Sequence, residues 1–271
     1  MMTAALVLGG AGLVLGTGLA FVATKFAVPT DERVAAVRER LPGANCGACG
    51  FPGCDGMAAA LVKGEAKPDG CTAGGPATAA AVAEVLGLEA VAGERMVVAV
   101  HCLGTNQAAR RSYEYVGIDD CRAAAIMPGG GPKACSFGCV GLGTCVKACP
   151  FGALAMDSES GLPVVDREKC TGCGICTQEC PKNIMALVPI SQPTLVSCRN
   201  LDKGPQVRKA CSAGCIACGL CVRSCPQKTI SLVNNVAYID PAGCDGCGTC
   251  VEKCPTKCIV AVHGVPVVQA V

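Results

Sequence analysis

Cysteine dominates the chemistry available to this sequence, since 25 of its 271 residues are cysteine and most of them lie in closely spaced runs. Three runs share the spacing C-x2-C-x2-C-x3-C-P, at residues 170–181, 215–226 and 244–255. Closely spaced thiolates are ligands for soft metal centres, above all zinc and iron–sulfur clusters. The odd count and the tight grouping argue against a framework of disulfides. The repeated four-cysteine spacing favours [4Fe–4S] clusters over zinc.

In such a run, three close thiolates hold one cluster and the fourth cysteine binds the neighbouring cluster. The tight loop wraps one cluster, while the helix after it carries the fourth cysteine away. This crossing predicts three ligand sets: Cys215, Cys218, Cys221 with Cys254; Cys244, Cys247, Cys250 with Cys225; and Cys170, Cys173, Cys176 with Cys149.

The run at residues 135–150 departs from this spacing, because Leu142 stands where the run at 215–226 has Cys218. The cluster there lacks a ligand unless another cysteine replaces it. We therefore predict a ligand set in which Cys135 fills the gap: Cys135, Cys139, Cys145 and Cys180. A [3Fe–4S] cluster is the alternative at this place.

A different motif lies upstream, with four cysteines at Cys46, Cys49, Cys54 and Cys71. The helical stretch between Cys54 and Cys71 can bring the last thiol back to the first three. Glycines at 47, 50 and 53 permit a close approach of the backbone to a cluster. The spacing predicts a fifth [4Fe–4S] cluster here, with zinc as the alternative.

Five cysteines remain outside these sets. Cys258 lies in an apolar context and is predicted to be a buried thiol. The other four precede the ferredoxin-like runs, and we expect them either to hold a sixth cluster jointly or to be free thiols: Cys102, Cys121, Cys198 and Cys211. The cofactors predicted are therefore five [4Fe–4S] clusters, or six.

Other chemistry finds little support in the sequence. The two histidines, His101 and His263, are isolated, and we expect His101 to be exposed rather than a ligand. No Ser/His/Asp set, phosphate-binding glycine loop or paired-carboxylate site is recognisable, so we predict no catalytic residues. The net charge of +2, made more negative by thiolate clusters, argues against nucleic acid as a partner.

The elements that position these cysteines can be outlined from the pattern. Helices are expected from Thr30 to Pro42, over residues 57–63 and over 77–86, followed by a strand at 96–100. The ranges 135–188 and 211–260 form an internal repeat, each with two cysteine runs about twenty residues apart. A duplicated two-cluster module explains this repeat.

The N-terminal stretch is uncharged from Met1 to Thr24, and Lys25 is the first charge. Its length suits a bilayer-spanning helix, and it lacks the basic start of a signal peptide. Positive charges follow the apolar stretch, which predicts a single-pass anchor with the N-terminus outside and the cluster domains on the cytoplasmic side of the plasma membrane. The glycine pair Gly12 and Gly16 indicates helix packing against other membrane subunits.

The predicted fold class is α+β. It comprises a transmembrane anchor over 1–28, a small helical [4Fe–4S] domain over 29–92, and two tandem ferredoxin-like modules over 93–194 and 195–271. Six basic residues with Asp202 among them either form a docking surface for an acidic soluble ferredoxin or are ordinary solvated charges: Arg199, Lys203, Arg208, Lys209, Arg223 and Lys228.

The order of anchor, cysteine motif and paired ferredoxin modules closely resembles the B subunit of the Rnf family, in its longer multi-cluster form. The resemblance covers essentially the whole chain. Its most telling matches are CGACGFPGC at 46–54 with Cys71, CSFGCVGLGTC at 135–145, and CPTKCI at 254–259.

This resemblance implies an electron-transfer subunit of an ion-translocating ferredoxin:NAD⁺ oxidoreductase, which is an enzyme complex. The chain would accept low-potential electrons from reduced soluble ferredoxin. It would relay them to membrane and peripheral subunits that carry flavins and the NAD site, coupled to Na⁺ or H⁺ movement. No bond-making step is expected on this chain. The alternatives are the electron-input subunit of a related complex that reduces a redox-sensing regulator, and a standalone polyferredoxin.

Overall fold

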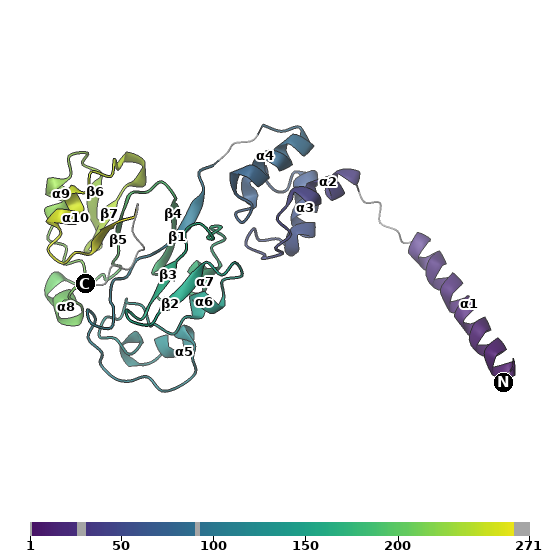
Figure 1. Ribbon diagram of the computed structural model, residues 1–271, viewed down its shortest axis with the longest axis horizontal. Coiled ribbons are helices and arrows are strands. Elements are labelled where there is room, and N and C mark those ends of the chain that lie inside the picture. The colour runs from purple at the N-terminus through teal and green to yellow at the C-terminus, as the bar shows by residue number, and fades with distance from the viewer. Residues whose placement is uncertain (1, 26–30, 90–92, 263–271) are drawn as a thin grey trace.

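The structure, a computed structural model, describes residues 2–25, 31–89 and 93–262. The first element, α1 (Met2–Lys25), is a helix that Figure 1 shows standing clear of the other elements. Within the described ranges no helix is both long enough and apolar enough to cross a membrane. The anchor expected at residues 1–28 therefore stays a prediction, and His263 lies outside the described residues.

A small helical unit follows, made of α2 (Glu32–Arg40), α3 (Gly53–Lys63), the short η1 (Pro68–Gly70) and α4 (Gly75–Leu86). Asp31 caps α2 by accepting the N–H of Arg33 at 2.9 Å. Its core is small and apolar, and it is formed mainly by Val37, Met57, Leu61 and Val82. The helices predicted from the sequence are confirmed here, although α3 begins earlier than expected.

The first ferredoxin-like module has two antiparallel pairs of strands. β1 (Met96–Val100) pairs with β4 (Met185–Pro189), and β2 (Leu154–Asp157) pairs with β3 (Leu162–Val165). Two short helices, α6 (Thr144–Lys147) and α7 (Ile175–Glu179), each follow a cysteine-rich loop. Between β1 and α6 the chain adds α5 (Cys121–Ala125) and η2 (Pro128–Gly130).

The second module repeats this plan. β5 (Thr194–Val196) pairs with β8 (Ile259–Ala261), and β6 (Ile230–Val233) pairs with β7 (Val236–Ile239). Its helices are α8 (Gly204–Ala210), α9 (Leu220–Ser224) and α10 (Thr249–Lys253), with η3 (Pro241–Gly243) between β7 and α10. The internal repeat is thus visible element by element (Figure 1).

The two modules share β5, since side chains alternate between the faces of a strand. Leu195 packs into the core of the first module, whereas its neighbour Val196 packs into the core of the second. The boundary expected between residues 194 and 195 therefore falls inside a shared strand. The two modules form one packed body rather than two separate domains.

This shared core predicts the effect of Leu195→Ala. Leu195 is only 2% exposed, so its truncation should cost about 2–5 kcal/mol. The measurement is anaerobic thermal unfolding of the full chain followed by circular dichroism. Leu232→Ala on β6, where the side chain is 43% exposed, is the control. Equal unfolding temperatures for the two variants would contradict the shared core.

Candidate iron–sulfur sites

In the helical unit, Cys46, Cys49, Cys54 and Cys71 line one cavity. Asn45 accepts the N–H of Cys54 at 2.8 Å, and this bond fixes the loop against the start of α3. Burial raises the pKa of the Cys71 thiol, and the charges of the other three cysteines raise it further. The set predicted from the sequence is therefore brought together.

In the second module, Cys215, Cys218 and Cys221 share a cavity with Cys254. Burial and the charges of Cys215, Cys218 and Cys254 raise the pKa of Cys221 to about 11. Cys221 lies on α9, and the chain leaves this group after that helix, as the crossing rule expects.

The second group of this module has the reverse arrangement, with three cysteines from the run at 244–255 and one from the run at 215–226. Burial raises the pKa of Cys250, and the charges of Cys244, Cys247 and Cys225 add to this effect. Cys225 directly follows α9 and Cys250 lies on α10. Each of the two cysteine runs therefore supplies one cysteine to the group formed mainly by the other run.

The first module repeats this arrangement once as predicted. The pKa of Cys176 rises to about 12 through burial and through the charges of Cys173, Cys170, Cys145 and Cys149. Of these neighbours, Cys145 belongs to the adjoining group. The structure thus brings Cys149 together with the 170–176 run.

The irregular run is completed differently from the prediction. The cavity beside it is lined by Cys121, Cys139, Cys145 and Cys180, and Cys135 is not among its lining residues. Burial raises the pKa of Cys145 to about 11, with the charges of Cys121 and Cys180 adding to it. The expected grouping with Cys135 is wrong. The gap left by Leu142 is filled from α5.

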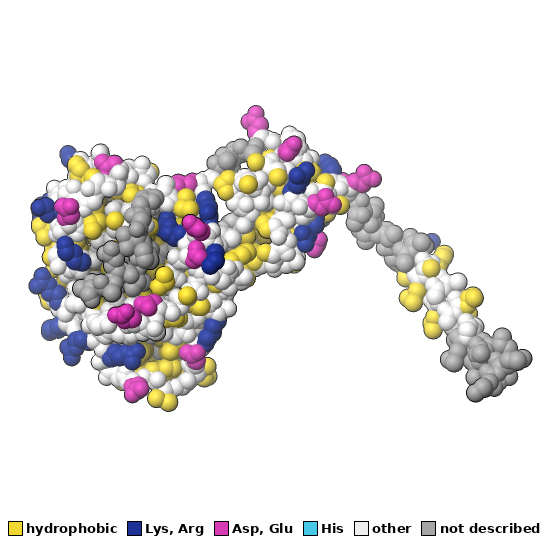
Figure 2. Space-filling model, in the orientation of Figure 1, with side chains coloured by type: hydrophobic (Ala, Val, Ile, Leu, Met, Phe, Trp, Pro, Cys, Tyr) yellow, Lys and Arg dark blue, Asp and Glu magenta, His cyan; other side chains and the backbone are white. Residues whose placement is uncertain are grey.

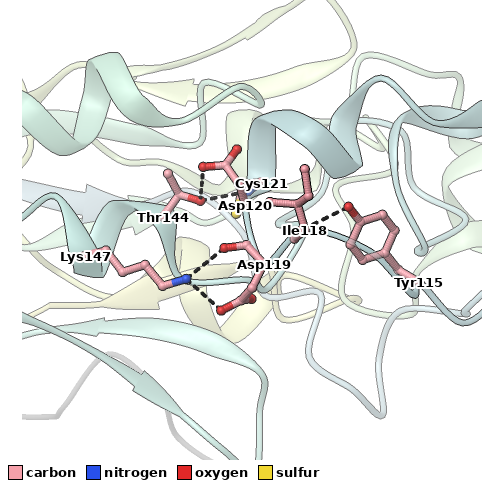
Figure 3. A network of polar contacts seen from close by, with 7 residues as sticks. All are labelled: Tyr115, Ile118, Asp119, Asp120, Cys121, Thr144 and Lys147. Carbon is pink, nitrogen blue, oxygen red and sulfur yellow. Dashed lines mark hydrogen bonds and ion pairs between the residues drawn. The ribbon is translucent and has the colours of Figure 1, made fainter.

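A polar network holds Cys121 in this position (Figure 3). The N–H of Cys121 donates to the Thr144 hydroxyl oxygen at 2.7 Å. Asp120 caps α5 by accepting the N–H groups of Arg122 and Ala123. Lys147 donates to the backbone and side-chain oxygens of Asp119 at 2.7 and 2.6 Å. Both ends of α6 are therefore tied to the segment that delivers the fourth thiol.

Cys135 instead joins three of the leftover cysteines. It lines a cavity together with Cys102, Cys198 and Cys211. The pKa of Cys211 is raised by burial and by the charges of Cys102 and Cys135. Asn200 Nδ2 donates to Cys135 Sγ at 3.2 Å and fixes that side chain. Cys121 is therefore not part of the sixth group, contrary to the sequence-based expectation.

This sixth group is symmetric with respect to the internal repeat. Cys102 and Cys198 each follow the strand that opens a module, and Cys135 and Cys211 each lie four residues before the first cysteine of a run. The spacing C-x3-C at 135–139 and 211–215 is the signal that would have identified this group from the sequence. Six groups of four now include every cysteine except Cys258.

Two ionisable side chains border the sixth cavity. Lys133 is 4% exposed, its Nζ donates to the carbonyl of Gly104 at 2.6 Å, and its charge lowers the pKa of Cys211 and Cys139 against the larger effect of burial. A buried cation of this kind offsets thiolate charge. His101 is partly buried rather than exposed: its Nδ1–H donates to Val196 O at 2.8 Å, and Nε2 is buried with no partner among the described atoms.

The six groups form a continuous series. The N–H of Cys215 donates to Cys198 Sγ at 3.2 Å, and the N–H of Cys139 donates to Cys102 Sγ at 3.4 Å. The sixth group therefore adjoins one group of each module. At the other end, the charge of Cys46 in the helical unit contributes to the raised pKa of Cys173 in the first module, although burial of Cys173 is the larger cause.

The donor sets fit iron–sulfur clusters. Each is made only of thiols, the soft ligands that such clusters use. Within the described ranges, no three His, Cys, Asp or Glu side chains lie close enough to share a single metal ion. Four of the thiol sets each line a single cavity, with all four thiols of the set on its wall.

Comparison with known proteins agrees with these features. Residues 41–73 match a family described as a putative Fe-S cluster, and residues 134–184 and 214–258 match a 4Fe-4S dicluster domain. The ferredoxin-like fold class and the presence of [4Fe–4S] domains are thereby confirmed.

Curated relatives match over most of the chain. The B subunit of the Na⁺-translocating ferredoxin:NAD⁺ oxidoreductase complex of Acetobacterium woodii is 50% identical over 86% of this chain and 70% of the relative. The proton-translocating counterpart of Clostridium ljungdahlii is 49% identical over 84% and 80%. The B subunit of the ion-translocating oxidoreductase complex of Methanosarcina acetivorans is 40% identical over 77% and 78%.

The chain therefore belongs to the family of B subunits of the ion-translocating ferredoxin:NAD⁺ oxidoreductase (Rnf) complex, as its sequence motifs indicated. It is an electron-transfer subunit of an enzyme complex.

The six groups predict the metal content. The full chain, isolated without oxygen, should contain about 24 iron and 24 sulfide, four of each per cluster. Cys121→Ala should lower both counts or convert one cluster to [3Fe–4S], detected by electron paramagnetic resonance (EPR). Cys258→Ala, which removes the one cysteine outside the groups, should keep both counts. Full content in Cys121→Ala, with loss in Cys258→Ala, would contradict the grouping.

Proposed function

We propose that this subunit takes electrons from reduced soluble ferredoxin and relays them through six [4Fe–4S] clusters to partner subunits with flavin and NAD sites. The thiolates would hold the clusters, and each cluster would carry one electron at a time. The continuous series of cysteine groups is the observation that supports this function. Among the relatives, one name specifies Na⁺ and another protons, so the coupling ion does not follow from the family.

The second module offers the better place for electron uptake. Cys218 and Cys247 are the two exposed cysteines, and each belongs to a different group of this module. A ligand at the surface shortens the path from an external donor. Arg223 Nη2 donates to the carbonyl of Cys218 at 3.3 Å, so a cation lies directly beside one exposed thiol.

Charge on this module suits an acidic donor. Lys and Arg side chains gather along the edge formed by α8 and α9 (Figure 2). The basic residues singled out in the sequence, Arg199, Lys203, Arg208, Lys209, Arg223 and Lys228, are all exposed, and none makes an ion pair among the described residues. Unpaired surface cations raise the rate of encounter with an anionic protein.

The helical unit is the proposed exit. Its group adjoins Cys173 of the first module, and it directly follows the N-terminal segment that we propose to anchor the chain. On α1, Leu13, Val14, Leu15 and Leu19 are 66–70% exposed, as suits a helix that packs on lipid or on membrane subunits. Lys25 ends α1, and Arg33, Arg38 and Arg40 follow it, which favours a cytoplasmic location for the cluster-bearing part.

Reversing the basic edge tests the uptake surface. The variant Arg208→Glu/Lys209→Glu/Arg223→Glu should lower the second-order rate of reduction by reduced ferredoxin about tenfold at low salt. The difference should shrink as salt screens the charges. The measurement is stopped-flow absorbance with the full chain in detergent.

Lys63→Glu on α3 is the matched control, since Lys63 is exposed but lies on the helical unit. An unchanged rate for the triple variant, or an equal loss for Lys63→Glu, would place ferredoxin elsewhere.

A further inference from the structure

Cys258, the cysteine outside the six groups, occupies a position that recurs four times in the chain. In each run, the fourth residue after the last cysteine is the one directly before a strand. These residues are Ala153 before β2, Ile184 before β4, Thr229 before β6 and Cys258 before β8.

The backbone has the same turn at all four positions. The preceding residue has a positive φ in every case: 60° at Gly152, 51° at Asn183, 55° at Lys228 and 53° at Lys257. Its N–H donates to the carbonyl of the last cysteine of the run at 3.1–3.4 Å. The four positions therefore differ in side chain but not in local geometry.

Only the second module has protic side chains here. Thr229 Oγ1 lies 3.6 Å from Cys225 Sγ, and Cys258 Sγ lies 3.6 Å from Cys254 Sγ. Cys258 is 2% exposed and lines the same cavity as Cys215 and Cys254. In the first module the counterparts, Ala153 and Ile184, are buried and have no proton to donate.

The direction of these hydrogen bonds follows from ligation. A cysteine bound to iron is a thiolate and can only accept. Thr229 and Cys258 must therefore be the donors. A donor at a ligand sulfur withdraws negative charge, and this stabilises the reduced cluster more than the oxidised one. Hydrogen bonds to the sulfurs are among the established determinants of cluster potential.

We propose that Thr229 and Cys258 are positioning residues that raise the reduction potentials of the two second-module clusters, through Cys225 and Cys254 respectively. This inference rests on the proposed cluster ligands. It makes the clusters at the ferredoxin-facing end better electron acceptors than an apolar residue at the same place would. It also gives Cys258 a role that depends on its thiol proton and not on binding iron.

Neighbouring donors do not remove this difference. Thr194 and Thr249 hydroxyls approach Cys244 and Cys247 at 3.4 and 3.5 Å. In the first module, the Val98 N–H donates to Cys170 at 3.4 Å, and Thr171 lowers the pKa of Cys173, behind the larger effect of burial. At Cys254, Thr256 Oγ1 lies 3.7 Å from Sγ and is a second donor beside Cys258, whereas the contact of Thr229 with Cys225 has no counterpart in the first module.

The test is a redox titration followed by EPR on the full chain in detergent. Thr229→Val removes the hydroxyl at nearly constant size and should lower one midpoint. The expected shift is about a tenfold fall in the ratio of reduced to oxidised cluster at fixed potential, or about 59 mV for one electron. Thr229→Ser, which keeps the donor, should restore the midpoint.

Cys258→Ala should lower a different midpoint by less, since a thiol is a weak donor, and Cys258→Ser should not lower it. The reciprocal variant is Ala153→Ser, which adds a hydroxyl in the first module and should raise the midpoint of the cluster bound by Cys149.

Iron and sulfide content separates the two proposals. If the wild-type chain lacks [4Fe–4S] clusters, the proposed function itself fails. If all variants keep full content and no midpoint moves, the positioning role is wrong. If Thr229→Val loses a cluster, Ala153→Ser decides: a raised midpoint supports the role, and an unchanged midpoint overturns it.

Discussion

The structure depends on groups of four thiols held around shared cavities. Burial, together with the charges of neighbouring cysteines, raises the pKa of Cys139 and of Cys176 to about 12. Four anions in one cavity repel one another unless cations lie between them. Iron bound by these thiolates would supply such cations in place of the protons, and this would link cluster binding to the folding of the loops. A chain with 3% aromatic residues has few other means to hold such small units together.

Duplication shapes the path between these groups. Each repeat supplies two exchanged groups, and the cysteines left over from both repeats meet at the centre. The backbone N–H groups of Cys139 and Cys215, which are equivalent positions, contact the sulfurs of Cys102 and Cys198. The shared strand β5 holds the two modules against each other at this point. In the proposed function, this arrangement would let electrons pass from one module to the other.

Much of this arrangement could be predicted from the sequence, because crossing ligands are encoded by local spacing and a following proline. The four-cysteine motif of the helical unit and the strand at Met96–Val100 are equally local. The exchange of Cys121 for Cys135 could not be derived in this way. Cys121 arrives on a long insertion whose path is set by Asp120, Thr144 and Lys147, and no spacing rule describes such contacts.

Other differences have similar causes. The module boundary expected at 194/195 falls within β5. A strand of three residues is too short to show a recognisable sequence pattern. The environment of His101 depends on Val196 across the module interface, far away in the sequence. The membrane anchor remains a prediction from composition and charge. The features that could not be predicted from the sequence depend on long-range contacts rather than on local propensities.

If the sixth group connects the two modules, Cys211→Ala should interrupt electron transfer between them. Reduced ferredoxin is mixed rapidly with the wild-type chain and with this variant, and cluster reduction is followed by freeze-quench EPR. In the variant, the two second-module clusters should be reduced as fast as in the wild type, while the remaining clusters should be reduced much more slowly. Equally fast reduction of all remaining clusters, in a variant shown to lack one cluster by iron and sulfide content, would contradict it.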